Sequence, residues 1–200
     1  MLTKIREKVE FWLEGIAKIL LKAKFTPNFL TILGFCLSLM AAYFYAVPRF
    51  FWYFWIGGTL LFVSSFCDVL DGVVARISGK NTILGGFLDS LMDRYSDTAA
   101  IFGITYHFAQ TSIFYVSGYI WGFLAIAGSI TVSYTRAKAE SLNIKLEGVG
   151  LAERPERILI IIGSSVFLHP EISLVILTIL TNVTVFQRTI FTFKKLKKLE

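Results

Sequence analysis

The chain has 200 residues, of which 55% are apolar and 16% aromatic, and its formal net charge is +6. The apolar residues gather in runs of about 20, the length that crosses a bilayer, which disfavours a large soluble core as their explanation. The basic residues lie beside these runs, where Lys and Arg face the cytoplasmic lipid surface, and this disfavours nucleic acid as the partner.

Residues 3–24 have the pattern of an amphipathic helix. Apolar side chains recur with helical spacing, for example at Ile5, Val9 and Ile16, and Lys and Glu stand between them. We expect this segment to lie on the membrane surface as an interfacial helix. Pro27 then marks the start of the next helix, because proline is favoured in the first helical turn.

Hydropathy predicts six membrane spans: 28–47, 50–77, 84–107, 112–135, 154–169 and 171–193. The fifth is short and needs tilt or local thinning of the bilayer. We therefore predict one all-α membrane domain over residues 1–200, with the interfacial helix, a six-span bundle at 28–193 and a basic tail at 194–200. Of the 20 Lys and Arg residues, all but Arg49 fall on one side, which predicts a multi-pass protein of the cell membrane with both termini in the cytoplasm.

Four aspartates frame the short connection between the second and third predicted spans. Asp68 and Asp71 are three residues apart and Asp89 and Asp93 are four apart, so each pair shares one helix face. The two helices are antiparallel neighbours, and the four carboxylates can converge at the membrane surface. Mg²⁺ prefers oxygen ligands, and two such ions held by shared carboxylates support phosphoryl transfer. One carboxylate remains to deprotonate an attacking hydroxyl.

Three further residues on the second span fit a ligand site. Gly72 and Ala75 have small side chains, which let a ligand approach the helix backbone closely. Arg76, one turn beyond Gly72, can bind a diphosphate. Each residue alone also has a plainer interpretation, namely helix packing for the glycine and an interfacial anchor for the arginine.

These residues belong to one longer motif. It reads Asp68-x-x-Asp71-Gly72-x-x-Ala75-Arg76, eight residues, Gly85-x-x-x-Asp89-x-x-x-Asp93. The motif resembles the complete signature of the CDP-alcohol phosphotransferase family, and every fixed position matches. The resemblance implies an integral membrane enzyme that moves a phosphate-bearing lipid group from a CDP-lipid donor onto an alcohol and releases CMP.

The resemblance also implies roles for individual residues. The four aspartates would hold two Mg²⁺ ions, with Mn²⁺ as a substitute, and Asp93 would also act as general base. The cytidine would lie against the two small residues of the motif, and the diphosphate against Arg76. Asn28 and Thr31, at the start of the first span, would border the nucleotide pocket, although a helix cap and a packing threonine explain them equally well. Members of the family are typically homodimers.

Basic residues on three of the predicted spans fall at the same membrane side as the aspartates. They are Arg136 and Lys138 after the fourth span, Arg157 at the start of the fifth and Arg188 near the end of the sixth. Cations from separate helices beside a metal site suggest an anionic acceptor that carries a phosphate. The positive-inside rule would place Lys and Arg here in any case. Arg188 stands apart, because five uncharged residues follow it, as expected for a side chain inside the apolar zone.

The residues around this basic set carry a second resemblance. The order Ser133-Tyr-x-Arg-Ala-Lys-Ala-Glu, then Glu-Arg-Pro-Glu-Arg, then Gln-Arg resembles prokaryotic phosphatidylinositol-phosphate synthases and their archaeal counterparts that act on CDP-archaeol. This implies inositol 1-phosphate as acceptor, held by the four basic residues with Ser133 assisting. The first two basic positions read Arg then Lys here, which keeps the charge and changes the donor geometry.

Other functions are also compatible with parts of the sequence. A family member with another acceptor, such as glycerol 3-phosphate, would use the same basic residues. A divalent-cation transporter would use the aspartates, but all four lie near one membrane face with no polar path through the remaining depth. The same aspartates disfavour a non-catalytic membrane anchor. The donor lipid, diacylglycerol or archaeol, is left undetermined, because the two differ in tails that meet only apolar surface.

Overall fold

The structure is a computed structural model that describes residues 13–146 and 148–198. Its labelled helices are α2 (Pro27–Ala46), α3 (Tyr53–Ser78), α4 (Ile83–Phe108), α5 (Gly118–Ser141), α6 (Arg154–Val166) and α7 (Pro170–Leu196). Two short antiparallel strands, β1 (Ser112–Ile113) and β2 (Val116–Ser117), pair as a hairpin before α5. The described part of the chain is therefore almost entirely helical, as the sequence predicts.

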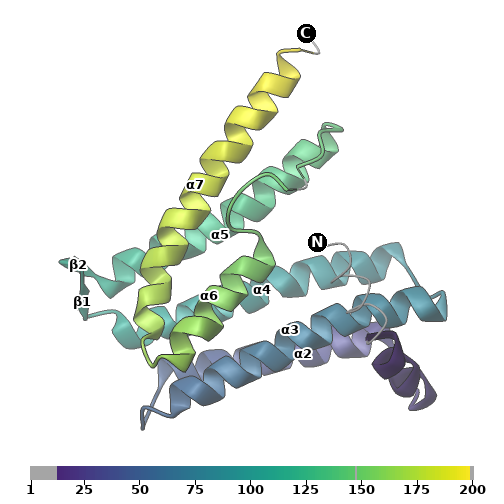
Figure 1. The fold of residues 1–200 in the computed structure, drawn as a ribbon, viewed down its shortest axis with the longest axis horizontal. Helices are drawn as coiled ribbons and strands as arrows, with labels where there is room; N and C mark the ends of the chain where they lie inside the picture. The colour runs from purple at the N-terminus through teal and green to yellow at the C-terminus, as the bar shows by residue number, and fades with distance from the viewer. Residues whose placement is uncertain (1–12, 147, 199–200) are drawn as a thin grey trace.

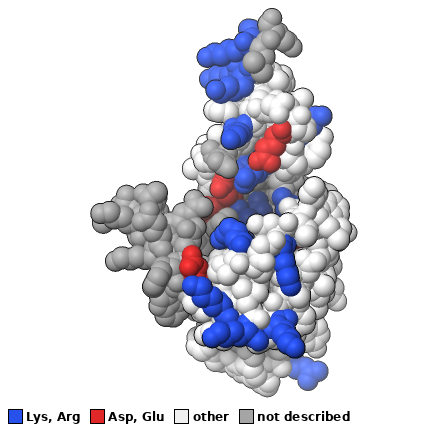
Figure 2. All heavy atoms as spheres, turned by 90° about the vertical axis from the view of Figure 1, so that its right-hand side faces the viewer, with Lys and Arg blue, Asp and Glu red and all other residues white. Residues whose placement is uncertain are grey.

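The helices pack in two groups, which are joined by α6 and by direct packing of α4 against α5. α2 packs against α3 and α4, α5 packs against α7, and α6 contacts both α3 and α7. Figure 1 shows the α3–α4 connection and the C-terminal ends of α5 and α7 directed away from the hairpin. Figure 2 looks onto this end of the molecule, where Lys and Arg gather with Asp and Glu between them. The charged residues thus share one pole of the fold.

Threonine side chains cap two of the helices that begin at this pole, α2 and α4. Thr26 Oγ1 accepts a hydrogen bond from the Phe29 N–H at 3.3 Å, and Thr82 Oγ1 accepts one from the Gly85 N–H at 2.9 Å. Such caps satisfy N–H groups of the first turn that have no partner within the helix. The Thr82 cap therefore fixes where α4 begins, and with it the register of the aspartates that follow.

The main core lies where the helices cross. Its buried members include Tyr45, Leu61, Ile104, Leu174 and Leu177. The Tyr45 hydroxyl and Ser165 Oγ are 2.8 Å apart, which links α2 to α6. At Gly103, α4 comes so close to α2 that an added Cβ would collide with the Ala42 backbone. Small residues at such crossings let helices in membrane proteins pack closely.

The predicted fourth span, 112–135, is wrong at both ends, because α5 runs from Gly118 to Ser141. Residues 112–117 form the hairpin, and α5 begins only at Gly118. The turn residues Phe114 and Tyr115 have φ of 48° and 65°, the left-handed values that two-residue hairpins require. Bulky aromatic residues rarely adopt them, so the sequence carried no turn signal. Each of the other five predicted segments coincides with a helix to within a few residues.

Much of the helical surface is apolar. Large side chains point outward from three helices, with Phe102 57%, Phe123 71% and Phe186 67% exposed. Extended exposed apolar surface marks contact with a membrane or with another protein. Among the described residues, α2 and α7 are long and apolar enough to cross a membrane by length and composition. α6 has only 13 residues, roughly 20 Å of helix.

The predicted interfacial helix, residues 3–24, falls only partly within the described chain. Residues 13–22 are helical, and the part of the prediction before residue 13 lies outside the described residues. Leu13 and Ala17 are buried against the start of α2 and the C-terminal half of α3. Ile19 is 67% exposed. The described part thus packs on the bundle with one face, and its exposed side carries Ile19 together with the charged residues Glu14, Lys18 and Lys22.

Candidate active site

Three of the four predicted aspartates meet at the charged pole. Asp68 and Asp71 lie in the C-terminal half of α3, Asp89 lies in the second turn of α4, and one oxygen from each falls within 4.8 Å of the others. Thr31 Oγ1 donates a 2.6 Å hydrogen bond to Asp71 Oδ2, which orients that carboxylate. Asp89 Oδ1 is buried without a hydrogen-bond partner among the described residues. We call these three residues the acidic cluster; their oxygens suit a hard divalent cation.

Asp93 lies one turn after Asp89 on α4 and is paired with arginine. Arg154 Nη1 is 2.8 Å from Asp93 Oδ1 and 2.5 Å from Asp68 Oδ2, so a single guanidinium forms ion pairs with both carboxylates. Arg94 Nη1 lies 3.8 Å from Asp93 Oδ2. Arg154 therefore neutralises part of the charge here. Asp93 lies at the edge of the acidic cluster, next to a cavity between α4, α5, α6 and α7 that is described below.

The first cavity, about 150 Å³, lies between α2, α3 and α4. Its lining includes Asn28, Thr31, Gly72, Ala75, Asp71 and Asp89, and also Lys80 and Thr82 from the α3–α4 connection. The nearest side-chain atom to a Cβ added at Gly72 would be Arg76 Nη1, at 3.8 Å. The helix backbone at Gly72 is therefore open to a ligand. Arg76 is exposed, and its guanidinium borders this opening without lining the cavity.

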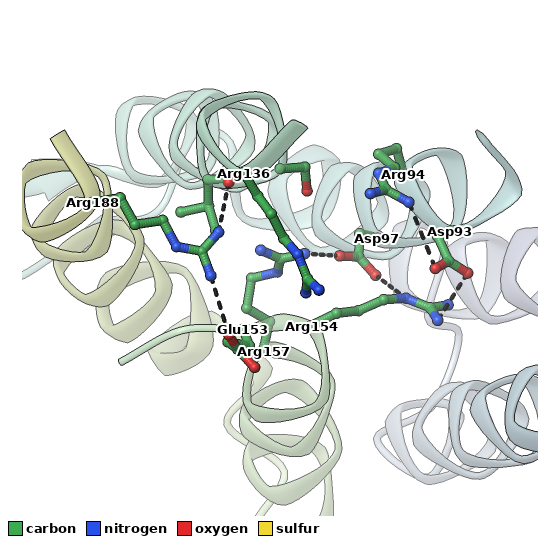
Figure 3. A pocket seen from close by; sticks show the side chains of 10 residues that line it. Asp93, Arg94, Asp97, Arg136, Glu153, Arg154, Arg157 and Arg188 are labelled. Carbon is green, nitrogen blue, oxygen red and sulfur yellow. Dashed lines mark hydrogen bonds and ion pairs between the residues drawn. The ribbon is translucent and has the colours of Figure 1, made fainter. Parts of the chain in front are cut away.

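The second cavity, about 130 Å³, lies between α4, α5, α6 and α7 (Figure 3). We call it the basic pocket; the predicted residues that line it are Ser133 and Arg136 from α5, Arg157 from α6 and Arg188 from α7. Asp93 also lines it, so it adjoins the acidic cluster. Lys138 is exposed and does not line it. Two residues correspond to a rotation of about 200° around a helix, which turns Lys138 away from the pocket that Arg136 lines.

Arg188 is held tightly by backbone and side-chain oxygens. Its side chain is 2% exposed. Nε donates to the Val149 carbonyl at 2.9 Å, Nη1 to the Val132 carbonyl at 2.8 Å, and Nη2 to Glu153 Oε1 at 3.2 Å. These bonds tie α7 to α5 and to the segment before α6 (Figure 3). Arg188 therefore holds the walls of the basic pocket in place as well as lining it.

The segment before α6 is fixed on α7 by a second set of contacts. Thr184 Oγ1 accepts hydrogen bonds from the Leu151 and Ala152 N–H groups, both at 3.0 Å. Gly150 has φ of 116°, and an added Cβ would collide with Thr184. Only glycine fits such a position readily. The segment before α6, which contains Gly150, thus places Arg154 at the edge of the basic pocket.

Two residues with no predicted role, Asp97 and Arg154, also line the basic pocket. The spacing of each residue in the sequence could have predicted its position. Asp97 follows Asp93 by four residues, as Asp93 follows Asp89, so the three share one face of α4. Arg154 precedes Arg157 by three residues in the Glu-Arg-Pro-Glu-Arg motif, which also places the two arginines on one helix face.

Both cavities and the acidic cluster lie within the part of the chain that matches a known family. The family model for CDP-alcohol phosphatidyltransferases matches residues 24–190. The chain belongs to this family. Its members are membrane enzymes that transfer phosphatidyl groups. The protein is therefore a transferase of phospholipid biosynthesis.

Individual relatives are similar over most of the chain. An archaetidylinositol phosphate synthase of Pyrococcus horikoshii is 40% identical over 201 residues, which cover 98% of this chain and 99% of the relative. A phosphatidylinositol phosphate synthase of Mycobacteroides abscessus is 33% identical over 157 residues, covering 76% of this chain and 67% of the relative.

Solved structures share the fold. The phosphatidylinositol phosphate synthase of Mycobacterium tuberculosis (PgsA1) with CDP-DAG bound has a TM-score of 0.76 and 27% identity, covering 90% of this chain and 93% of that chain. The same enzyme in complex with manganese and citrate also has a TM-score of 0.76, with 28% identity and coverage of 90% and 88%. The fold described above is therefore that of a membrane-enzyme family.

Proposed function

We propose that the protein transfers a phosphatidyl-type group from a CDP-lipid to inositol 1-phosphate in a Mg²⁺-dependent reaction, releasing CMP and forming a phosphoinositol-phosphate lipid. The observation that carries this proposal is the position of the acidic cluster between two cavities, one bordered by the CDP-alcohol motif and the other by arginines of three helices. The relatives named above are synthases of archaetidylinositol phosphate and phosphatidylinositol phosphate. The solved relative binds CDP-DAG.

The acidic cluster would hold the metal. Asp68, Asp71 and Asp89 offer oxygen ligands, Asp89 has a buried oxygen without a partner in the described chain, and Asp93 would complete the ligands for two ions. When bound, Mg²⁺ would offset the negative charge of the diphosphate and of the departing CMP. Mn²⁺ would substitute, in line with the relative solved in complex with manganese. A second ion would compete with Arg154 for the oxygens of Asp68 and Asp93.

We propose Asp93 as the general base. In the reaction, the acceptor hydroxyl oxygen bonds to the phosphorus that carries the lipid alcohol. The bond from this phosphorus to the bridging oxygen of the diphosphate breaks, and CMP leaves with that oxygen. Asp93 takes the hydroxyl proton, because its carboxylate lies between the acidic cluster and the basic pocket. Arg76, beside Gly72, would bind the diphosphate.

The basic pocket fits the phosphate of the acceptor. Arg136, Arg157 and Arg188 reach it from three helices, with Ser133 beside them. Arg157 Nε is buried and has no hydrogen-bond partner among the described residues, which leaves a donor for an anion. Lys138, exposed near the same pole, stays a predicted contact only. Glycerol 3-phosphate carries the same phosphate, and the identity of the relatives favours inositol phosphate over it.

An apolar groove beside the acidic cluster suits the lipid tails of the donor. It encloses about 260 Å³ between α3 and α6. Its lining includes Phe62, Phe66, Val69, Ile158 and Leu159, together with Asp68 and Arg154. A lipid in this groove would have its diphosphate at the carboxylates. Relatives at 40% and 38% identity are archaetidylinositol phosphate synthases, so CDP-archaeol is the donor to test first, with CDP-diacylglycerol second.

The arrangement in the membrane extends the proposal. α2 to α7 would form the six-span bundle of a single domain over residues 1–200, with both termini and the active site in the cytoplasm. The basic pole in Figure 2 supports this orientation. Two copies would form a homodimer, as the family resemblance implies. Light scattering of the purified protein tests the dimer, and labelling of single cysteines at each end of the bundle in intact cells tests the orientation.

Turnover with a panel of acceptors tests the function. Purified protein in lipid nanodiscs receives Mg²⁺, a CDP-lipid and inositol 1-phosphate, free inositol or glycerol 3-phosphate, and CMP release is measured. We expect inositol 1-phosphate to exceed inositol by about a hundredfold or more, because an empty arginine pocket leaves buried donors unpaired. Equal rates with inositol would contradict the phosphate assignment. Preference for glycerol 3-phosphate would favour the other acceptor, and Mg²⁺ flux through proteoliposomes without CMP release would favour a transporter.

A further inference from the structure

We propose that Asp97 is a positioning residue that holds Arg157 in the basic pocket. The inference rests on the proposed function of the basic pocket as the acceptor site. Asp97 lies on α4 two turns beyond Asp89 and outside the acidic cluster itself. Its role would be to set the geometry of arginines that meet the acceptor, without contacting the reacting atoms.

The contacts of Asp97 use both of its carboxylate oxygens. Oδ2 accepts a hydrogen bond from Arg157 Nη2 at 2.6 Å, and Oδ1 accepts one from Arg154 Nε at 3.4 Å (Figure 3). The Asp97 and Arg157 side chains are 7% and 5% exposed. Charge-assisted hydrogen bonds are among the strong ones in proteins, and the bond to Arg157 is the shorter of the two. Asp97 thus joins the two arginines of α6 at one point on α4.

A buried guanidinium needs such a partner. Leaving one member of a buried ion pair without the other is strongly destabilising, because the remaining charge stays desolvated. Among the described residues, Asp97 is the one carboxylate paired with Arg157; the other contact of the guanidinium is a 3.4 Å bond from Nη1 to the Ala152 carbonyl. The guanidinium is planar, so a bond at Nη2 also sets the direction of Nε. The unpartnered Nε–H of Arg157 is therefore held ready for a ligand by Asp97.

Arg154 extends the link toward the donor side. Its Nε faces Asp97, and its Nη1 contacts Asp68 and Asp93. Acidic and basic groups therefore alternate from the acidic cluster to the basic pocket in the order Asp68, Arg154, Asp97, Arg157. Without Asp97, Arg157 would lose its paired carboxylate while it faces the other arginines of the pocket, and repulsion would favour its displacement.

The test compares Asp97→Asn with a matched control on the same turn of α4. Asp97→Asn keeps the shape and removes the charge. We expect the acceptor KM to rise about tenfold or more, as for loss of a bond to a charged group, while the donor KM and the Mn²⁺ Kd stay at wild-type values. Ser96→Ala is the control, because Ser96 is buried and bonds Ser38 Oγ at 2.9 Å without lining the basic pocket. It should leave all three constants unchanged.

A double variant distinguishes a role of Asp97 in positioning Arg157 from a general loss of protein stability. If Asp97 acts through Arg157, the double variant Asp97→Asn/Arg157→Gln should have the same acceptor KM as Arg157→Gln alone. Multiplied effects of the two substitutions, an acceptor KM of Asp97→Asn equal to wild type, or a matching rise of the donor KM would overturn the inference. Should Asp97→Asn not fold, Asp97→Glu keeps the charge and should raise the acceptor KM severalfold with an unchanged donor KM; an unchanged acceptor KM would again contradict it.

Phosphate binding tests the role of Asp97 independently of the proposed reaction. Calorimetry with inorganic phosphate, in the absence of divalent metal, measures the basic pocket without turnover. We expect phosphate to bind wild type and Ser96→Ala alike and to bind Asp97→Asn about tenfold more weakly. Equal phosphate affinity in Asp97→Asn would reject the role of Asp97. Failure of wild type to use inositol phosphate, with the expected difference in phosphate binding, would reject only the acceptor.

Discussion

Replacing Arg188 by alanine should destabilise the protein as well as weaken acceptor binding. Arg188 is 2% exposed and donates three hydrogen bonds, to the carbonyls of Val149 and Val132 and to Glu153. Each bond to a charged group contributes about 1.5–3 kcal/mol, and removal of one partner from a buried ion pair costs about 3–5 kcal/mol in total. We expect the free energy of unfolding of Arg188→Ala to fall by about 3–5 kcal/mol.

Thermal unfolding in detergent measures this loss. For a chain of this size, such a change lowers the midpoint by about 10 °C. Lys138→Ala is the matched control, because it removes one positive charge from the same pole but an exposed one. It should leave the midpoint unchanged. Arg188→Ala should also raise both the acceptor KM and the sensitivity of the α5–α6 segment to proteases.

The opposite result would refute the reasoning. A wild-type unfolding midpoint in Arg188→Ala, with only the acceptor KM raised, would mean that the contacts to Val149, Val132 and Glu153 do not hold the pocket walls. Arg188 would then serve the ligand alone.

Three further substitutions test separate parts of the site. Asp93→Asn should keep the Kd for CDP-lipid and lose the single-turnover rate, because an amide cannot accept the proton; weaker donor binding with an unchanged rate would make Asp93 a ligand only. Arg76→Ala should weaken donor binding in a titration with CDP-lipid and leave the acceptor KM constant, and the reverse pattern would move Arg76 to the acceptor. Thr31→Val removes the 2.6 Å bond to Asp71 and should raise the Mn²⁺ Kd measured by calorimetry about tenfold or more; an unchanged Kd would show that Thr31 does not orient that carboxylate.

The sequence predicts the acidic cluster well because its geometry is local. Spacings of three and four residues place each aspartate pair on one helix face, and a short connection forces α3 and α4 to be antiparallel neighbours. The bond between Thr31 and Asp71 joins residues 40 positions apart. No spacing rule predicts such a pair, so the sequence alone left Thr31 open between ligand contact and packing.

Long-range contacts also explain what the sequence did not predict. Periodicity distinguishes the exposed Lys138 from Arg136 only once the pocket side of α5 is known. Arg188 has the pattern of a ligand contact, and its bonds to the segment before α6 appear only in the fold. Asp97 carries a visible spacing, but its partners on α6 lie 57 and 60 residues further along the chain.

Product analysis tests the central claim most directly. Wild-type protein is incubated with Mg²⁺, CDP-archaeol or CDP-diacylglycerol, and inositol 1-phosphate, and the lipids and nucleotides are identified by mass spectrometry, with Asp89→Asn as the inactive comparison. We predict one phosphoinositol-phosphate lipid for each CMP released, and neither product from Asp89→Asn or in the presence of a metal chelator. CMP released together with a lipid that lacks inositol phosphate, or full activity of Asp89→Asn at saturating Mg²⁺, would contradict the account.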